Sequence, residues 1–275
     1  MFGEEHTSHE SLEDGSPREV LHVAWPIVVS MLSYTAMGVC DTLFVGWLGK
    51  TELAAVGIAT TAFFLVNAFF LGLLRGVKVV AAQLSGADRE AAAVTAGWVG
   101  ALLAVPFGVA VVGLSLFRET IFALLGGAPA VRILAGEYFA VRTLGAGLWY
   151  GAMAFGNYFQ GVGDTKTPMK VAIIANGANL ALDPMLIFGI GPFPALGVEG
   201  AAWATVINQG CGLVVAAAFF VVRVGWRPRW SGDVAAKVLR LGLPMGVQQA
   251  LGTAGFTVFT ALLARMGEAQ LAAHQ

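Results

Sequence analysis

Charge is what this sequence has least of. Only 12% of its 275 residues are Asp, Glu, Lys or Arg, whereas soluble domains carry about 25%. Its two cysteines, Cys40 and Cys211, both lie in apolar runs and give no sign of a disulfide framework or a metal site. No basic segment precedes an apolar run at the start, so the polar, acidic residues 1–16 are not a signal peptide. The net charge of −1 gives no sign of a nucleic-acid partner, and none is expected.

Apolar residues take the place of the missing charge and make up 57% of the chain. Most of the apolar runs lack the polar stripe of a helix at a soluble surface, and they reach the roughly 20 residues that cross a bilayer. The sequence therefore predicts an all-α integral membrane protein. Its helices are expected near 19–48, 53–84, 91–117, 131–160, 168–190, 197–223 and 236–265.

The breaks between these runs predict the organisation of the chain. We expect a disordered cytoplasmic tail (1–17), a transmembrane lobe of six helices (18–223), a cytoplasmic linker (224–235) and the first helix of a second lobe (236–275). Basic residues favour a cytoplasmic N-terminus, because nine lie on its side of the membrane and four on the other. The nine are Arg18, Arg89, Lys166, Lys170, Arg223, Arg227, Arg229, Lys237 and Arg240.

An internal repeat supports the second lobe. Shifting the chain by 218 residues lays Val20–Ala55 over Val238–Ala273 without a gap, with Pro26 over Pro244 and a shared "G-x-x-x-LAA" at the end. Six helices precede the second copy, so both copies have the same orientation, as in transporters with parallel repeats. A complete second unit would end near residue 453, and we therefore expect this chain to be a fragment with one whole lobe and the start of the next.

Three acidic residues lie inside predicted helices, where a charge is costly and indicates function. Asp41 and Asp183 each lie eight residues before the outer end of a helix, which is roughly 12 Å at 1.5 Å per residue. Glu137 lies roughly 9 Å below the outer end of another helix by the same measure. The sequence thus predicts three carboxylates in one layer of the outer half of the membrane.

Neutral oxygen ligands accompany these acids. Asn179 lies one turn before Asp183 on the same helix face, and Pro184 leaves the carbonyl of Leu180 without its helical donor. With the Thr205 hydroxyl this is an all-oxygen set, which suits a hard cation or a proton. The alternative is a structural network, for instance an ion pair between Glu137 and Arg142, and this alternative is the stronger one for Glu137.

No enzyme motif is visible among the predicted helices, and none of the four histidines has a spacing that suggests a metal site. "GVGDTKTP" lacks the G-K-[ST] of a phosphate-binding loop; Thr167 as a helix cap and Pro168 at the first helical position explain it locally. Arg75 and Lys78 lie near the inner end of the second helix, where reaching to the cytoplasmic headgroups is the default explanation.

Five segments carry a resemblance to a known family: "DTLFVGWLGKTELAAVG" (41–57), "EYFAVRTLG" (137–145), "FQGVGDTKTP" (159–168), "NLALDPMLIFGIG" (179–191) and "GVEGAAWATVINQ" (197–209). In order and spacing they resemble the multidrug and toxic compound extrusion (MATE) family. The resemblance implies a twelve-helix, V-shaped protein of two lobes, monomeric in its full length. It also implies efflux of small amphiphilic, often cationic compounds in exchange for Na+ or H+, with no other cofactor.

The resemblance also assigns residues. It implies a cation or proton site formed by Asp41, Asn179, Asp183 and Thr205, with Tyr138 close by. Glu137 and Pro184 are expected in supporting positions, and Pro26 and Pro184 as points where a helix bends when the site is occupied.

Two departures from the family pattern leave other readings open. Arg75 and Lys78 stand where small and polar residues are expected, and the C-terminal lobe is missing. The alternatives are a flippase of lipids or lipid-linked sugars from the same superfamily, which Arg75, Lys78 and Arg142 would suit, and a fragment that does not transport. The expected location is the bacterial inner membrane, in contact with lipid.

Overall fold

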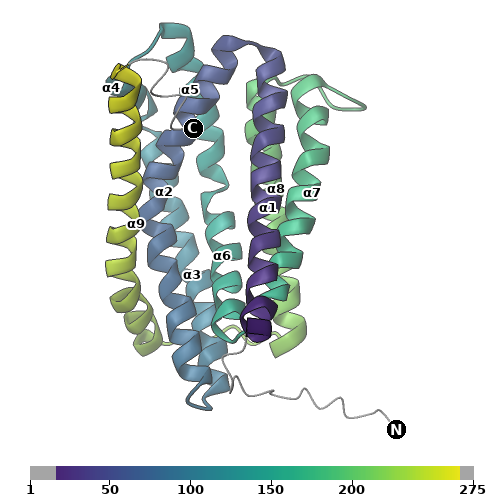
Figure 1. The fold of residues 1–275 in the computed structure, drawn as a ribbon, viewed down its shortest axis with the longest axis vertical. Coiled ribbons are helices and arrows are strands. Elements are labelled where there is room, and N and C mark those ends of the chain that lie inside the picture. The colour runs from purple at the N-terminus through teal and green to yellow at the C-terminus, as the bar shows by residue number, and fades with distance from the viewer. Residues whose placement is uncertain (1–16, 267–275) are drawn as a thin grey trace.

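Long, nearly parallel helices make up the described part of the protein (Figure 1). The computed structural model describes the backbone of residues 17–266 and the side chains of residues 20–260. Within this part there are nine helices: α1 (Pro17–Leu48), α2 (Lys50–Ser85), α3 (Glu90–Ser115), α4 (Arg118–Leu125), α5 (Pro129–Leu144), α6 (Ala146–Gly161), α7 (Lys166–Phe188), α8 (Val198–Val224) and α9 (Gly232–Met266). The expected tail and the repeated "LAA" at 271–273 lie outside the described residues.

Five of these helices, α1, α2, α3, α7 and α8, are long and apolar enough to cross a membrane. Their outward-facing side chains include many large apolar groups, for example Trp47 at 70% and Val222 at 86% exposure. A soluble protein of this size would bury most of them, whereas a bilayer accepts them. The predicted all-α membrane fold is confirmed.

The predicted helix 131–160 differs from the structure, which divides it into α5 and α6 at Gly145. The Gly145 N–H donates to the carbonyl of Arg142, three residues back, instead of four. A side chain would be crowded here, because a Cβ on Gly145 would overlap Oε1 of Gln209 and lie 3.2 Å from Cγ2 of Val206, both on α8. The close approach of α8 at this glycine explains the break.

The predicted loop after residue 117 also differs, because residues 118–125 form the short helix α4. Its Phe122 is buried and packs against Phe139 of α5, with ring centroids 5.6 Å apart. Burial of this one aromatic side chain against α5 thus stabilises α4, which is too short and too polar to span the membrane.

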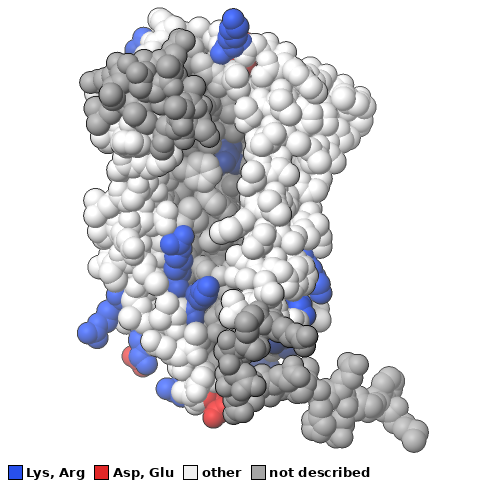
Figure 2. All heavy atoms as spheres, in the orientation of Figure 1, with Lys and Arg blue, Asp and Glu red and all other residues white. Residues whose placement is uncertain are grey.

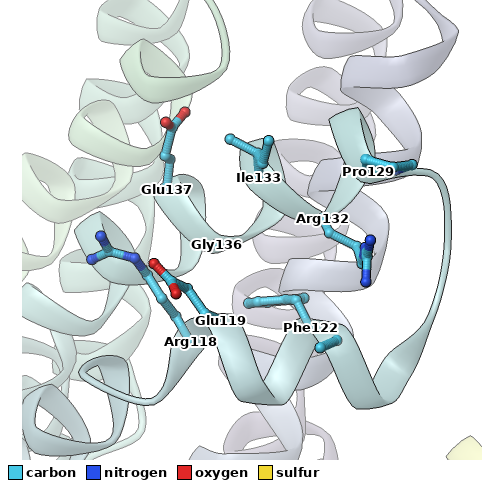
Figure 3. Close-up of a pocket in the computed structure, with 9 residues that line it drawn as sticks. Arg118, Glu119, Phe122, Pro129, Arg132, Ile133, Gly136 and Glu137 are labelled. Atoms are coloured by element: carbon cyan, nitrogen blue, oxygen red, sulfur yellow. The ribbon is translucent and has the colours of Figure 1, made fainter.

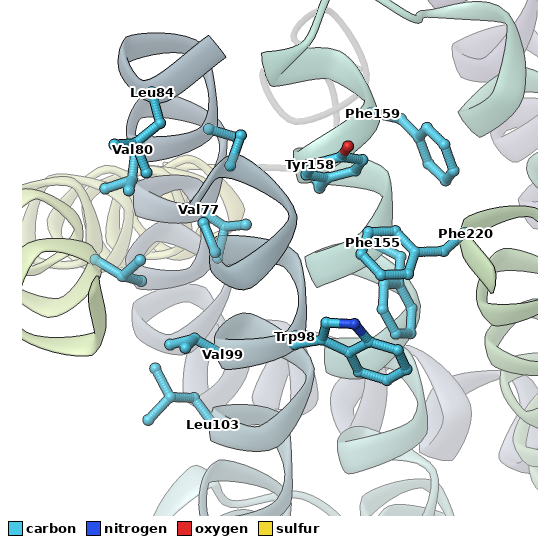
Figure 4. Packing of buried hydrophobic residues seen from close by; sticks show 14 of the residues in the cluster. Val77, Val80, Leu84, Trp98, Val99, Leu103, Phe155, Tyr158, Phe159 and Phe220 are labelled. Atoms are coloured by element: carbon cyan, nitrogen blue, oxygen red, sulfur yellow. The ribbon is translucent and has the colours of Figure 1, made fainter. Parts of the chain in front are cut away.

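Aromatic residues pack together in the half of the bundle where α3 begins and α6 and α8 end (Figure 4). Phe220 of α8 lies among Trp98 of α3 and Phe155 and Tyr158 of α6, with ring centroids 4.7–5.3 Å apart. A second cluster, in the other half of the bundle, contains Phe63, Phe139 and Ile187. The candidate site described below lies beside this second cluster.

Helix α9 packs along α2, at one side of the molecule (Figure 1). Glycines face each other there: a Cβ on Gly72 would lie 2.7 Å from Cα of Gly246, and one on Gly76 would lie 3.1 Å from Cα of Gly242. Small residues of this kind let two helix backbones approach closely in a membrane. We call this contact the α2–α9 seam.

Candidate functional site

Asn179 and Asp183 lie one turn apart on the buried face of α7. They are 0% and 1% exposed, and Asn179 Nδ2 donates to Asp183 Oδ1 over 3.0 Å. The i, i+4 spacing places the two side chains on one face. Helix α7 continues through Pro184 to Phe188, so Asp183 is held inside a helix although a proline follows it.

Asp41 reaches the same point from α1. Its carboxyl group lies within hydrogen-bonding reach of the carboxyl group of Asp183. About one turn beyond the two acids, the Phe44 and Trp47 rings of α1 lie 6.3 and 6.1 Å from the Phe188 ring of α7. These aromatic contacts set the position of α1 along α7. The structure therefore brings together two acids that are 142 positions apart in the sequence, as their common depth predicted.

Two further predicted residues lie around this pair. Thr205 of α8 is buried, and its hydroxyl donates to the carbonyl of Ala201 over 3.0 Å, which leaves its oxygen lone pairs available. Tyr138 of α5 is buried within hydrogen-bonding reach of Thr60. Both residues line the same cavity as Asp41.

This cavity has a volume of about 540 Å³ and mostly apolar walls. Its aromatic lining comes from Tyr34, Phe64, Tyr138 and Trp149, and its polar lining from Asp41, Thr60, Arg142 and Thr205. Figure 2 shows the groove that runs down this face of the molecule, with basic side chains along it. Asp183 does not line the cavity, so it lies behind Asp41.

Arg142 also lies in the wall of this cavity, whereas the sequence suggested it only as a partner of Glu137 or as a basic residue suited to a flippase. It is 7% exposed, and its guanidinium lies 4.5 Å from the ring centroid of Phe63 and 6.0 Å from that of Tyr138. Its Nε and Nη1 atoms have no hydrogen-bond partner among the described residues. The spacing of four from Tyr138 was the signal that places it on the same helix face.

Several oxygens of this site lack a protein donor. Asp41 Oδ1, Asn179 Oδ1 and Asp183 Oδ2 are buried without a hydrogen-bond partner among the described residues. Within the same part of the chain, no three His, Cys, Asp or Glu side chains form a group that could hold a metal. Two carboxylates, an amide and a hydroxyl form an all-oxygen set, which suits a hard cation or a proton.

Glu137 does not join this set, because its side chain points away from it although the sequence predicts the same depth. It is exposed and lines two outer pockets, one with Arg118 and Arg132 and one with Glu52 and Glu199. In Figure 3 its carboxylate points away from Arg118. One residue rotates a helix by about 100°, so Tyr138 reaches the cavity of Asp41 whereas Glu137 does not. The alternative ion pair of Glu137 with Arg142 is also not formed in the structure.

Comparison with known proteins identifies the fold and its relatives. The MatE family model matches residues 26–185 of the chain. The chain belongs to the MatE family. This family is that of the multidrug and toxic compound extrusion transporters, as the resemblance of the sequence had indicated.

The MatE relatives include proteins from distant bacteria. The chain is 29% identical over 267 residues to a probable multidrug resistance protein NorM of Thermotoga maritima, covering 94% of this chain and 57% of that protein. It is 33% identical over 266 residues to a probable NorM of Deinococcus radiodurans, with the same shares covered. A MOP superfamily transporter from Pyrococcus furiosus has a similar structure, with a TM-score of 0.82 and 25% identity over 93% of this chain and 57% of that one.

The chain thus spans a little over half of the length of the MatE proteins that it matches. This share is consistent with the expected fragment of one lobe and the start of the next. The relatives are membrane transporters, and the long apolar helices of this chain agree with a place in a membrane.

Proposed function

We propose that this protein, in its complete natural form, exports small amphiphilic, cationic compounds in exchange for Na+ or H+. The place of Asp41 supports this proposal best, because its carboxylate lies against Asp183 on one side and lines the aromatic cavity on the other. A cation at the carboxylate pair and a cationic substrate in the cavity compete for the same negative charge. Each ligand then weakens the binding of the other, which is what exchange requires.

The coupling ion would relieve the repulsion between Asp41 and Asp183. Two unit charges about 4 Å apart repel by about 4 kcal/mol at an effective dielectric constant of 20. One Na+ between the carboxylates, or one proton shared by them, removes most of this cost. Asn179 and Thr205 would supply further oxygen ligands to Na+, and no other cofactor is proposed.

The substrate would lie in the cavity beside Asp41. Its aromatic walls suit a flat apolar body, and the rings attract a cation through their faces. The bulk of the substrate would stay in contact with Phe64 and Trp149 while its charge lies near Asp41. This arrangement requires no catalytic group.

The location and orientation of the protein in the membrane are part of the same proposal. We place the protein in the bacterial inner membrane with a cytoplasmic N-terminus, since most basic residues lie at that end of the helices. The Asp164–Arg223 ion pair, 2.7 Å long, would then lie at the cytoplasmic surface. The transporter would work as a monomer in contact with lipid.

Transport by reconstituted vesicles tests the proposal. Asp41→Asn is expected to reduce export of a fluorescent cationic dye at least tenfold, whereas Glu137→Gln, an outer-half acid outside the site, is expected to leave it unchanged. Wild-type export by Asp41→Asn would overturn the proposal. Clamping the pH gradient and adding or removing Na+ distinguishes the two coupling ions.

A flippase of lipids or lipid-linked sugars is the second candidate. Arg142 favours it, because it places a buried positive charge in the cavity wall, and Arg75 and Lys78 add exposed basic groups on α2. Movement of labelled lipid between leaflets in the same vesicles, without export of the dye, would support the flippase and exclude drug exchange.

A further inference from the structure

Three buried asparagines continue inward from the Asp41–Asp183 pair. Asn179 and Asn176 lie four and seven residues before Asp183 on α7, and Asn208 lies three residues after Thr205 on α8. They are 0%, 5% and 6% exposed. Since α7 runs outward and α8 runs inward, all three lie on the inner side of the carboxylates. We call them the asparagine row.

Helix α1 lies along this row. Asn176 Nδ2 donates to Ser33 Oγ over 2.9 Å, and Asn208 Nδ2 lies 3.7 Å from Met37 Sδ. Ser33, Met37 and Asp41 are spaced by four residues, so one face of α1 covers the row from the carboxylates inward. The row is therefore enclosed by α1, α7 and α8.

The amide oxygens of the row have no donor. Oδ1 of Asn176, Asn179 and Asn208 is buried in each case without a partner among the described residues. Burial of a carbonyl oxygen without a hydrogen bond is strongly unfavourable, and water is the usual partner when the protein supplies none. Three oxygens in need of a donor thus follow one another inward from the carboxylates.

Two buried asparagines elsewhere in the bundle form hydrogen bonds with other helices or with their own helix. Asn67 Nδ2 donates to the carbonyl of Phe63, and its oxygen accepts from the Tyr150 hydroxyl. Asn157 Nδ2 donates to the carbonyl of Leu74 over 3.1 Å. The nearby Gln209 also has an oxygen without a donor, but that oxygen points at Gly145. Asn67 shows that the oxygen of a buried amide in this bundle can have a protein donor.

We propose that the asparagine row binds a file of water molecules and is the inner exit of the coupling ion. Na+ would pass from Asp183 to the amide oxygens as it regains water, and a proton would pass along the water molecules themselves. This inference rests on the proposed exchange function. Ala172 and Met169, both buried, follow Asn176 inward on the same face and mark the inner end of the row.

Access of Ag+, an ion of similar size and charge to Na+, tests whether the row is hydrated. Single cysteines are introduced as Asn176→Cys and Asn208→Cys after Cys40→Ala and Cys211→Ala. Val206→Cys is the matched control, because Val206 is buried at the same depth of α8 but faces Gly145. We expect the two row cysteines to react with Ag+ at least tenfold faster than the control. Equal rates for row and control cysteines would overturn the inference.

A second measurement separates this inference from the proposed function. Asn176→Leu is expected to slow ion-driven export at least tenfold, while equilibrium binding of the coupling ion at Asp41 and Asp183 changes less than twofold. Wild-type export by Asn176→Leu would overturn the exit role. Should Asp41→Asn export normally, the exchange function fails, but the Ag+ rates still decide whether the row holds water.

Discussion

Replacing each carboxylate by its amide should weaken ion binding unequally. Asp183→Asn and Asp41→Asn both remove one charge and keep the shape of the side chain. The two acids differ in their surroundings, because Asp183 is 1% exposed and lies behind Asp41, which lines the cavity of about 540 Å³. Water in that cavity screens Asp41 and not Asp183.

The size of the difference follows from screening. A unit charge about 4 Å from a cation contributes about 4 kcal/mol at an effective dielectric constant of 20 and about 1 kcal/mol in bulk water. The contribution of the buried Asp183 should be about 4 kcal/mol, and that of Asp41 should lie between about 1 and 4 kcal/mol. We therefore expect Asp183→Asn to weaken binding of the coupling ion about a thousandfold, and Asp41→Asn about ten- to a hundredfold.

Equilibrium binding to the purified protein measures both effects. Radioactive Na+ binding is used if export in vesicles requires Na+, and proton uptake on acidification if it does not. Glu137→Gln serves as the control, since Glu137 is exposed and outside the site. An equal or larger loss in Asp41→Asn than in Asp183→Asn, or a similar loss in Glu137→Gln, would refute the argument from burial.

Two more predictions concern the break in the fold and the buried cation. Gly145→Ala places a methyl group against Oε1 of Gln209 and 3.2 Å from Cγ2 of Val206, and it should cost about 1–3 kcal/mol in thermal unfolding. Gly177→Ala, with nothing within 4 Å, should be neutral or stabilising by up to about 1 kcal/mol. Equal melting temperatures would contradict the close contact. Arg142→Met should strengthen binding of a cationic dye about five- to thirtyfold, because it removes a positive charge worth about 1–2 kcal/mol from the cavity wall. Arg142→Lys keeps the charge and should bind the dye like the wild type; unchanged binding in Arg142→Met would show that the guanidinium does not act on the cavity.

Much of the arrangement could be predicted from local patterns. Apolar runs located most of the long helices to within a few residues, because a bilayer demands a continuous apolar stretch. Distance from a helix end placed Asp41 and Asp183 at one depth, and the i, i+4 rule placed Asn179 beside Asp183. These features depend only on position along a helix axis.

The direction in which a side chain points around its helix axis was harder to predict. Glu137 shares the depth of the site but points away from it, while Arg142 lies in the cavity wall. In a helix that is apolar on most sides, the sequence carries little periodicity to say which face meets its neighbours. The break at Gly145 likewise depends on the approach of α8, which is a property of the packed bundle and not of the α5–α6 segment.

The α2–α9 seam also has a consequence for synthesis of the protein in the membrane. Gly72 and Gly246 meet in the fold, yet 174 positions separate them in the chain. At 5–20 residues per second, the ribosome makes α9 about 10–35 s after the glycine face of α2. During this interval the α2 backbone faces lipid or the insertion machinery, and the seam closes only after the bundle of α1 to α8 has been made. Bulky substitutions at Gly72 would therefore act at a late step of assembly, after the earlier helices are already in place.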